Sequence, residues 1–353
     1  MKILHTADLH LRSITDVRWQ ALERVVELAQ SENVRVLAIS GDLFDSDADG
    51  QTLRPKIREV FERFGGNVLI IPGNHDANAY PDGTYFGDNV TILRDLLMPE
   101  TIDGVCFWGF PYEEMGEEEI LPFLTMAAER AEPDATHVLL FHGELYDMIG
   151  GWAEYGEEGR QRYLPVKLSY FQRLPWQYVL AGHFHSNFSV HEIQENQYFV
   201  YSGSPVSVTR RETGIRKVNL FTIGEVPQPR LLNSFYYHIL RISLDPFAEK
   251  TPLQTITERM VNLPEHAGML LHINGFINSK KLAMSETELR EALLRLVSEK
   301  GDIASIEFRD VHEVLENDLF KRFRERLDAR DLDDAEKQRI LDVTVKAMME
   351  INE

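Results

Sequence analysis

Short apolar runs alternate with amphipathic stretches in the first part of the chain. Three of the runs predict strands, at residues 3–4, 34–40 and 68–71. Apolar residues at helical spacing predict two helices between them, at residues 16–30 and 53–64. Thr15 or Asp16 is placed to cap the first helix, and Gly65-Gly66 ends the second. This alternation predicts a sheet of parallel strands covered by helices.

The pattern changes in the middle of the chain. Five further strand candidates follow, at residues 137–141, 178–181, 188–193, 197–201 and 217–223. Because the last four have little helix between them, we expect a second sheet that is more antiparallel than the first.

Pro227 and Pro229 interrupt this pattern and mark a boundary. Three strands are expected beyond it, at residues 237–244, 269–273 and 303–308. A helix over residues 285–300 has a capping box of Ser285 and Glu288 and a stop at Gly301. Residues 236–312 therefore predict a small α+β domain.

The tail, residues 317–352, predicts two helices separated by residues 331–334. Each helix has an apolar stripe: Leu319, Phe320, Phe323 and Leu327 on the first, and Ile340, Val343, Ala347 and Ile351 on the second. Helices with such stripes pack on each other or on the core of the protein, or they bind a partner through the stripes. The pattern leaves both interpretations open.

Length and composition place the chain among ordinary globular proteins. A chain of 353 residues favours two domains, and 43% hydrophobic with 27% charged residues excludes wholesale disorder. No apolar run approaches the roughly 20 residues that span a bilayer. Cys106 is the single cysteine, so a reducing, cytoplasmic setting is expected.

The net charge of −20 argues against a polyanionic partner such as DNA only if it is evenly spread. Residues 113–158 hold 13 acidic residues and one basic residue, whereas residues 159–241 hold 10 basic and 4 acidic residues. The second stretch could form a basic surface, and an ordinary solvated surface is the alternative. The candidates for that surface are Arg160, Arg162, Lys167, Arg210, Arg211, Arg216 and Lys217.

Residues of metal-binding types follow five of the predicted strands at once. The segments are Asp8-Leu9-His10, Gly41-Asp42, Gly73-Asn74-His75-Asp76, His142 and Gly182-His183-Phe184-His185. Because the carboxyl ends of parallel strands meet at one edge of a sheet, we expect these side chains to gather there. The glycines allow the sharp turns that such a placement needs.

The mixture of carboxylate, amide and imidazole groups suits Mn, Fe or Zn better than Ca, and Mg would use fewer histidines. The ligands are too many for one ion, and one carboxylate bridging two ions is the economical arrangement. Centres with two metal ions serve phosphoester hydrolysis.

The order and spacing of these motifs resemble the calcineurin-like metallophosphoesterase superfamily, in particular its SbcD-type DNA double-strand-break repair nucleases. The segments 3–11, 41–45 and 201–205 are also similar to that family's opening strand, second motif and closing turn. The likeness is strong over residues 1–222 and rests on layout after residue 236. It implies an α/β sandwich of two mixed β-sheets flanked by helices, a small α+β capping domain and a C-terminal helix–loop–helix.

The resemblance also implies a role for each motif residue. One divalent ion, with Mn favoured over Mg, Fe or Zn, would be held by Asp8, His10, Asp42 and His185. A second ion would be held by Asp42, Asn74, His142 and His183, with Asp42 bridging. His75 would be the catalytic histidine, oriented by Asp76, while a hydroxide between the ions attacks the phosphate.

Three parts and several partners are implied as well. Residues 1–235 would be the nuclease domain, residues 236–312 the DNA-capping domain, and residues 313–353 the segment that docks on an SMC-like (SbcC-type) ATPase. The expected partners are DNA ends, that ATPase and a second copy in a homodimer, with no membrane. The acidic charge predicts weak DNA affinity for the isolated chain.

Two other functions are weighed against this one: a small-molecule phosphodiesterase or phosphatase, and a catalytically silent scaffold. Small-molecule enzymes of the superfamily usually lack a domain like residues 236–312, and a scaffold would lack ligands or His75. One departure is Asp45, because some relatives have a histidine there. Asp45 is either an acceptor behind a ligand histidine or a helix cap, and the cap is slightly favoured.

Overall fold

The computed structural model describes residues 1–148, 164–186, 188–298 and 301–351. The chain divides into two compact units, Met1–Tyr237 and His238–Glu353. None of the described helices is long and apolar enough to cross a membrane.

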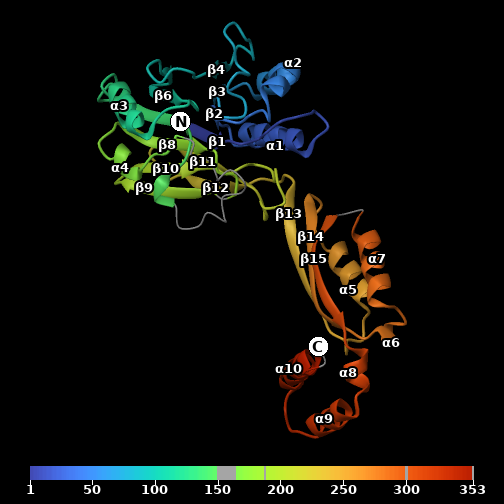
Figure 1. Cartoon of the computed structure of the whole chain (residues 1–353). Coiled ribbons are helices and arrows are strands. Elements are labelled where there is room, and N and C mark those ends of the chain that lie inside the picture. Colours follow the sequence, from blue (N-terminus) through green and yellow to red (C-terminus); the bar gives the residue numbers. More distant parts are fainter. Residues whose placement is uncertain (149–163, 187, 299–300, 352–353) are drawn as a thin grey trace. The chain divides into compact units, whose positions relative to one another are not determined.

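The first unit is built on two six-stranded sheets (Figure 1). The first sheet contains β1 (Lys2–Thr6), β2 (Val36–Ser40), β3 (Asn67–Ile71), β4 (Val90–Ile92), β11 (Lys217–Thr222) and β12 (Gln228–Leu231). Its order is β12-β11-β1-β2-β3-β4; β1 to β4 are parallel, and β11 and β12 are antiparallel additions. The predicted parallel strands are therefore confirmed.

The second sheet has the order β5-β6-β7-β8-β10-β9. Its strands are β5 (Glu100–Ile102), β6 (Val105–Phe110), β7 (Thr136–His142), β8 (Trp176–Gly182), β9 (Ser189–Gln194) and β10 (Gln197–Tyr201). The expectation of a more antiparallel sheet is wrong, because β6, β7, β8 and β10 run parallel. The hairpin of β9 and β10 returns the chain parallel to β8, and the fifth candidate became β11 of the first sheet.

Helices cover the outer faces of both sheets, and alternate strand residues fill the space between the sheets. On β1, Leu4 packs under α1 (Val17–Ser31) and α2 (Asp47–Phe64), whereas Ile3 joins the core shared with Leu140 of β7. The second sheet carries α3 (Glu117–Ala128), the short 3-10 helix η1 (Tyr146–Met148) and α4 (Leu168–Phe171). This sandwich of two mixed sheets flanked by helices is the α/β architecture that the resemblance implied.

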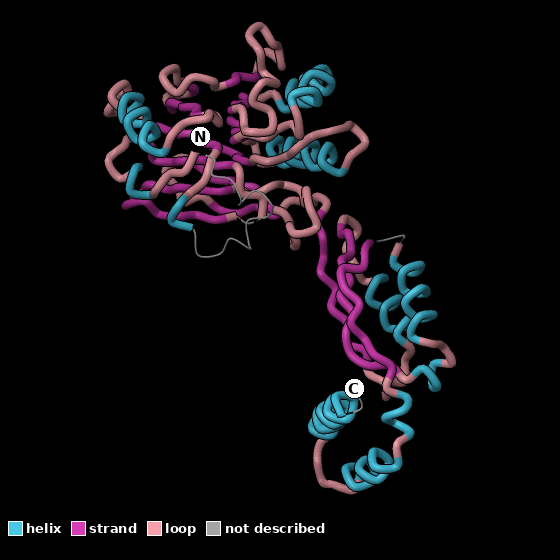
Figure 2. The backbone as a smooth tube through the Cα atoms, viewed as in Figure 1, coloured by secondary structure: helices cyan, strands magenta, loops and turns pink. Residues whose placement is uncertain are grey.

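The second unit has a three-stranded sheet in the order β13-β14-β15. The strands are β13 (Tyr236–Leu244), β14 (Ala267–Ile277) and β15 (Gly301–Asp310), and β14 and β15 are parallel. The helices α5 (Pro252–Val261) and α7 (Glu286–Val297) pack on one face of this sheet, as Figure 2 shows, and α6 (Ser279–Leu282) follows β14. Ser285 and Glu288 form the expected capping box, but Gly301 opens a strand rather than ending the helix.

The tail consists of α8 (His312–Glu316), α9 (Asp318–Asp328) and α10 (Asp334–Ile351). Phe320 and Leu327 are buried as predicted, whereas Leu319 is 69% exposed. On α10 the predicted stripe is wrong in phase: Leu341 and Val345 are buried, and Val343 is 67% exposed. Both positions satisfy helical spacing, and only the packing against α8 and α9 selects one face.

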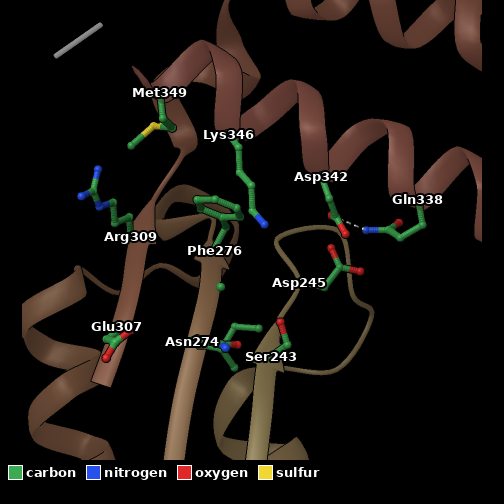
Figure 3. A pocket seen from close by; sticks show the side chains of 12 residues that line it. Ser243, Asp245, Asn274, Phe276, Glu307, Arg309, Gln338, Asp342, Lys346 and Met349 are labelled. Carbon is green, nitrogen blue, oxygen red and sulfur yellow. Dashed lines mark hydrogen bonds between the residues drawn. The ribbon is translucent and has the colours of Figure 1, made fainter. Parts of the chain in front are cut away.

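A hollow of about 700 Å³ lies between α10 and the strands of the second unit (Figure 3). Side chains of both charges line it, including Asp245, Arg309, Asp342 and Lys346. None of the predicted metal ligands lies there, so this hollow is not the predicted site.

Candidate metal centre

The predicted ligands follow strands of both sheets of the first unit. Asp8 and His10 follow β1, and Asp42 follows β2. His142 ends β7, and His185 follows β8. The loops are tied together by backbone hydrogen bonds from Asp8 N to Gly41 O (3.1 Å) and from His10 N to Asp42 O (3.0 Å). The ligands therefore gather where the two sheets meet, rather than at the edge of one sheet.

Four of the predicted ligands have left-handed backbone conformations that residues other than glycine rarely adopt. The φ angles are 57° at Asp8, 50° at His10, 51° at Asp42 and 107° at His183. Each such residue costs on the order of 1–3 kcal/mol, and this kind of strain clusters at functional sites. The surrounding fold must therefore hold the loops in place.

Two glycines make the close approach of the loops possible. A Cβ atom at Gly41, where φ is +91°, would lie 2.1 Å from His142 Nδ1. A Cβ atom at Gly182 would lie 2.0 Å from the carbonyl oxygen of Ser40. A side chain at either position would push a neighbouring loop out of the centre.

The first cluster of possible ligands is Asp8, His10 and His185. All three are buried, and one ligand atom from each lies within 4.8 Å of the others. The Nε2 atoms of His10 and His185 are only 3.1 Å apart. The other ring nitrogen of His185, Nδ1, lies 3.2 Å from Glu212 Oε1. Two imidazole nitrogens turned toward each other are the arrangement that a shared cation would satisfy.

The second cluster surrounds His142. Its Nδ1 lies 2.8 Å from the carbonyl oxygen of Ser40, which can only accept, so Nδ1 carries a proton. Its Nε2 faces Asn74 Oδ1 at 2.9 Å and Asp42 Oδ2 at 3.4 Å. Three acceptor atoms converge here, and either a metal ion or a second proton on His142 satisfies them. The donors therefore fit a divalent metal ion.

Electrostatics indicate that the second proton is present on His142 when no metal ion is bound. Burial lowers the pKa of His142, but the charge and hydrogen bond of Asp42, together with Asp8 and the Ser40 carbonyl, outweigh burial and raise that pKa to about 9. Burial likewise raises the pKa of Asp42, but His142 and His10 overcome it and hold the pKa well below its usual range. The pair is thus an imidazolium beside a carboxylate, and a metal ion that binds must displace a proton.

His75 borders both clusters. Its backbone N–H donates to Asp42 Oδ1 at 2.9 Å, and its ring lies edge-on to His10 with centroids 4.7 Å apart. His10, Asp42 and His75 also form a third group whose ligand atoms lie within 4.8 Å of one another. His75 is therefore next to the centre, where a catalytic histidine is needed.

Asp76 is fully buried and accepts three hydrogen bonds. They come from Gly73 N at 2.7 Å, Phe44 N at 3.1 Å and the Tyr80 hydroxyl at 2.7 Å. Burial, together with the charge of Asp42, raises its pKa to about 6. These bonds hold the loop that carries His75, and the predicted orientation of the His75 ring by Asp76 stays a prediction.

His183 lies at the side of the second cluster rather than in any of the three groups. Its ring centroid is 5.5 Å from that of His142, and its backbone N–H donates to Asp8 Oδ1 at 3.0 Å. Its Nε2 lies 3.5 Å from Oε1 of Glu144, a buried carboxylate. His183 therefore stays a predicted ligand with a buried glutamate beside it.

Asp45 is not a helix cap, and the slightly favoured interpretation is wrong. Ser46 caps α2 by accepting from Asp49 N. Asp45 instead pairs with Arg12 at 2.8 Å and with Arg18 at 2.9 Å. Its Oδ1 also lies 3.7 Å from His10 Nδ1, so it sits behind a predicted ligand histidine.

One residue of the predicted basic surface, Arg216, is buried. Arg216 is only 3% exposed and donates to the carbonyl oxygens of Ser204, His185 and Ser186. Lys167 pairs with Glu117 at 3.2 Å, and Arg160 and Arg162 lie outside the described residues.

Glu144, Glu212 and Arg216 are buried charged residues that lie beside the centre and outside the motifs. Glu144 is two residues beyond His142, and that proximity is the one signal in the sequence that could have drawn attention to it. Glu212 and Arg216 reach the centre only through the fold of residues 203–216.

Comparisons with known proteins identify the family of the chain. Residues 1–187 match the family described as calcineurin-like phosphoesterase. The chain belongs to the calcineurin-like phosphoesterase family. The D component of the nuclease SbcCD of Staphylococcus saprophyticus is 24% identical over 263 residues, which cover 67% of this chain and 68% of that protein.

Two solved structures are also similar to the chain. A dimetal phosphatase from Danio rerio is 12% identical with a TM-score of 0.39, over 66% of this chain and 96% of that one. Pseudomonas putida nuclease MPE is 18% identical with a TM-score of 0.25, over 39% of this chain and 59% of that one.

Proposed function

We propose that this phosphoesterase is a two-metal phosphodiester hydrolase that cleaves DNA ends in double-strand-break repair. The observation that carries the proposal is the convergence of His10, His185, Asp42, Asn74 and His142, whose acceptor atoms face one another. The SbcCD component that is 24% identical supports DNA as the substrate. The mixed imidazole, carboxylate and amide ligands suit Mn, Fe or Zn, and the resemblance to SbcD-type nucleases favours Mn among these.

The side chains would divide the work as follows. Asp8, His10 and His185 would hold one ion, Asn74, His142 and His183 the other, and Asp42 would bridge. Two such ions polarise the phosphate and supply a nucleophile at neutral pH. His75 would stabilise the developing charge or protonate the leaving oxygen. Asp76 would keep the His75 loop in place through its bonds to Gly73 and Phe44.

The remaining parts of the chain would serve substrate and partner. Residues 1–235 would be catalytic, residues 236–312 would cap the DNA, and residues 313–353 would dock on an SbcC-type ATPase. The exposed apolar side chains of Leu319 and Val343 are available to such a partner. A homodimer and a cytoplasmic setting complete the proposal. Because the net charge is −20, we expect the chain to hold DNA weakly without that ATPase.

The test compares wild type with His75→Ala on end-labelled linear DNA and on bis-p-nitrophenyl phosphate, with Mn²⁺ and with or without the ATPase. His191→Ala is the matched control, because His191 lies on β9 and the hydrogen bond described for its ring joins it to Ser189, outside the centre. We expect His75→Ala to lose cleavage of both substrates, and His191→Ala to keep it.

The outcome on DNA separates the competing functions. Cleavage of the small diester without cleavage of DNA, with the ATPase present, would identify a small-molecule phosphodiesterase. Cleavage of neither substrate by wild type would identify a silent scaffold.

A further inference from the structure

A buried carboxylate lies behind the ligand histidine His185. Glu212 is 1% exposed, and its Oε1 is 3.2 Å from His185 Nδ1. The opposite ring nitrogen, Nε2, faces His10 Nε2 at 3.1 Å. The His185 ring thus lies between an acidic residue that no motif contains and the first cluster of possible metal ligands.

Backbone and hydroxyl donors fix the Glu212 carboxylate in place. Its Oε2 accepts from Val208 N at 2.8 Å, and its Oε1 accepts from Thr209 N at 3.1 Å and from the Thr209 hydroxyl at 3.0 Å. A carboxylate surrounded by donors acts as an acceptor. The His185 Nδ1 that faces it must then donate, which leaves the lone pair of His185 on Nε2.

The backbone of His185 is held by the same segment. Arg216 donates to the carbonyl oxygen of His185 and, at 3.0 Å, to that of Ser204. Ser204 N also donates to His185 O at 3.0 Å, and the Ser204 hydroxyl donates to the carbonyl oxygen of Asp8 at 2.8 Å. Ring and backbone of His185, together with the backbone of Asp8, are therefore fixed by residues 204–216.

We infer that Glu212 is the positioning residue of the first cluster: it keeps the His185 proton on Nδ1 and presents Nε2 to the metal ion. Arg216 and Ser204 set the backbone from which His185 reaches that ion. The inference rests on the metal binding proposed above. Carboxylates in this position orient ligand histidines and raise their basicity.

The inference makes a selective prediction. Glu212 contacts His185, whereas the second cluster is built on His142, whose ring is fixed by Ser40 instead. Loss of the Glu212 charge should lower the binding affinity of one of the two metal ions by about 10- to 100-fold. The affinity of the other ion should be unchanged. A residue that merely stabilised the fold would affect both ions alike.

The first experiment needs no substitution. Histidine ring nitrogens of the ¹⁵N-labelled, metal-free full chain are assigned by NMR, and the His185 tautomer is determined. We expect the proton on Nδ1. A proton on Nε2 of His185 would overturn the inference, whatever the variants do.

The second experiment titrates the metal-free full chain with Mn²⁺ by calorimetry, for wild type, Glu212→Gln and Thr209→Val. Glu212→Gln keeps the size of the side chain and removes its charge, and Thr209→Val removes one donor while leaving Glu212 against His185. We expect a selective loss of one binding step in Glu212→Gln and a smaller loss in Thr209→Val. Thermal unfolding checks that each variant folds. If Glu212→Gln does not fold, the tautomer of His185 in the wild-type chain tests the inference instead.

Two failures are distinguishable. If wild type binds no Mn²⁺, the proposed metal-dependent function fails. If wild type binds two ions and Glu212→Gln binds both as tightly, only the role of Glu212 is refuted.

Discussion

The close approach of two loops at Gly41 gives a sharp prediction for Gly41→Ala. The added Cβ would lie 2.1 Å from Nδ1, 2.6 Å from Cγ and 2.8 Å from Cε1 of the His142 ring. The ring must move, which breaks its 2.8 Å bond to Ser40 and turns its Nε2 away from Asp42. Gly41 also has φ of +91°, so alanine adds backbone strain there.

Gly65→Ala is the matched control, because it carries the backbone strain without the clash. Gly65 has φ of +74° at the C-terminus of α2, and nothing lies within 4 Å of the place that its added methyl group would take. Left-handed backbone costs a non-glycine residue about 1–2 kcal/mol. Both variants should therefore lose about that much free energy of unfolding, and Gly41→Ala somewhat more.

Activity should separate the two variants. Displacing a group that orients a metal ligand typically costs 10- to 100-fold in metal affinity or activity, and here the ligand itself moves. We expect Gly41→Ala to lose about 100-fold or more in the Mn²⁺-dependent hydrolysis of bis-p-nitrophenyl phosphate. Gly65→Ala should keep wild-type hydrolysis while its thermal unfolding midpoint falls. Full hydrolysis by Gly41→Ala would refute the placement of His142 in the centre.

Three further predictions concern protons, metal and the tail. Because Asp42 raises the pKa of His142 to about 9, Mn²⁺ must expel a proton. The affinity for Mn²⁺ should therefore rise with pH from 6.5 toward 9. Calorimetry of Mn²⁺ binding in buffers of different ionisation enthalpy should detect the released proton. Equal heats of binding in all buffers would contradict this prediction. Chelation should lower the thermal unfolding midpoint, and added Mn²⁺ should restore it by mass action; an unchanged midpoint would argue against a centre that binds metal in the folded state. Leu319→Asp and Val343→Asp should weaken binding to the ATPase partner in a pull-down, whereas the similarly exposed Leu231→Asp in the first unit should not. Unaltered binding by both tail variants would remove the proposed docking face.

Local signals in the sequence predicted much of the centre. Short buried strands followed at once by Asp8 and Asp42 need no long-range information, because parallel strands of one sheet deliver their carboxyl ends together. His142 ends a strand of the second sheet, so its place beside them depends on how the two sheets pack. The capping box of Ser285 and Glu288 is a local signal of the same kind.

Features that depend on distant packing could not be predicted. Strand direction in the second sheet is set by how β9 pairs with β10, and the buried face of α10 is set by its neighbours. Glu212 and Arg216 look like surface residues in a basic stretch until the fold buries them beside His185. Asp45 sits where a cap would, but Ser46 one residue later has the extended backbone that a cap needs.

The most direct test of the central claim is cleavage of end-labelled linear DNA by the chelator-treated full chain, with the ATPase partner present, before and after Mn²⁺ is added. The account predicts no cleavage before addition, cleavage after it, and none with His75→Ala under either condition. Cleavage without metal, or a chain that hydrolyses bis-p-nitrophenyl phosphate with Mn²⁺ but leaves DNA intact, would contradict it.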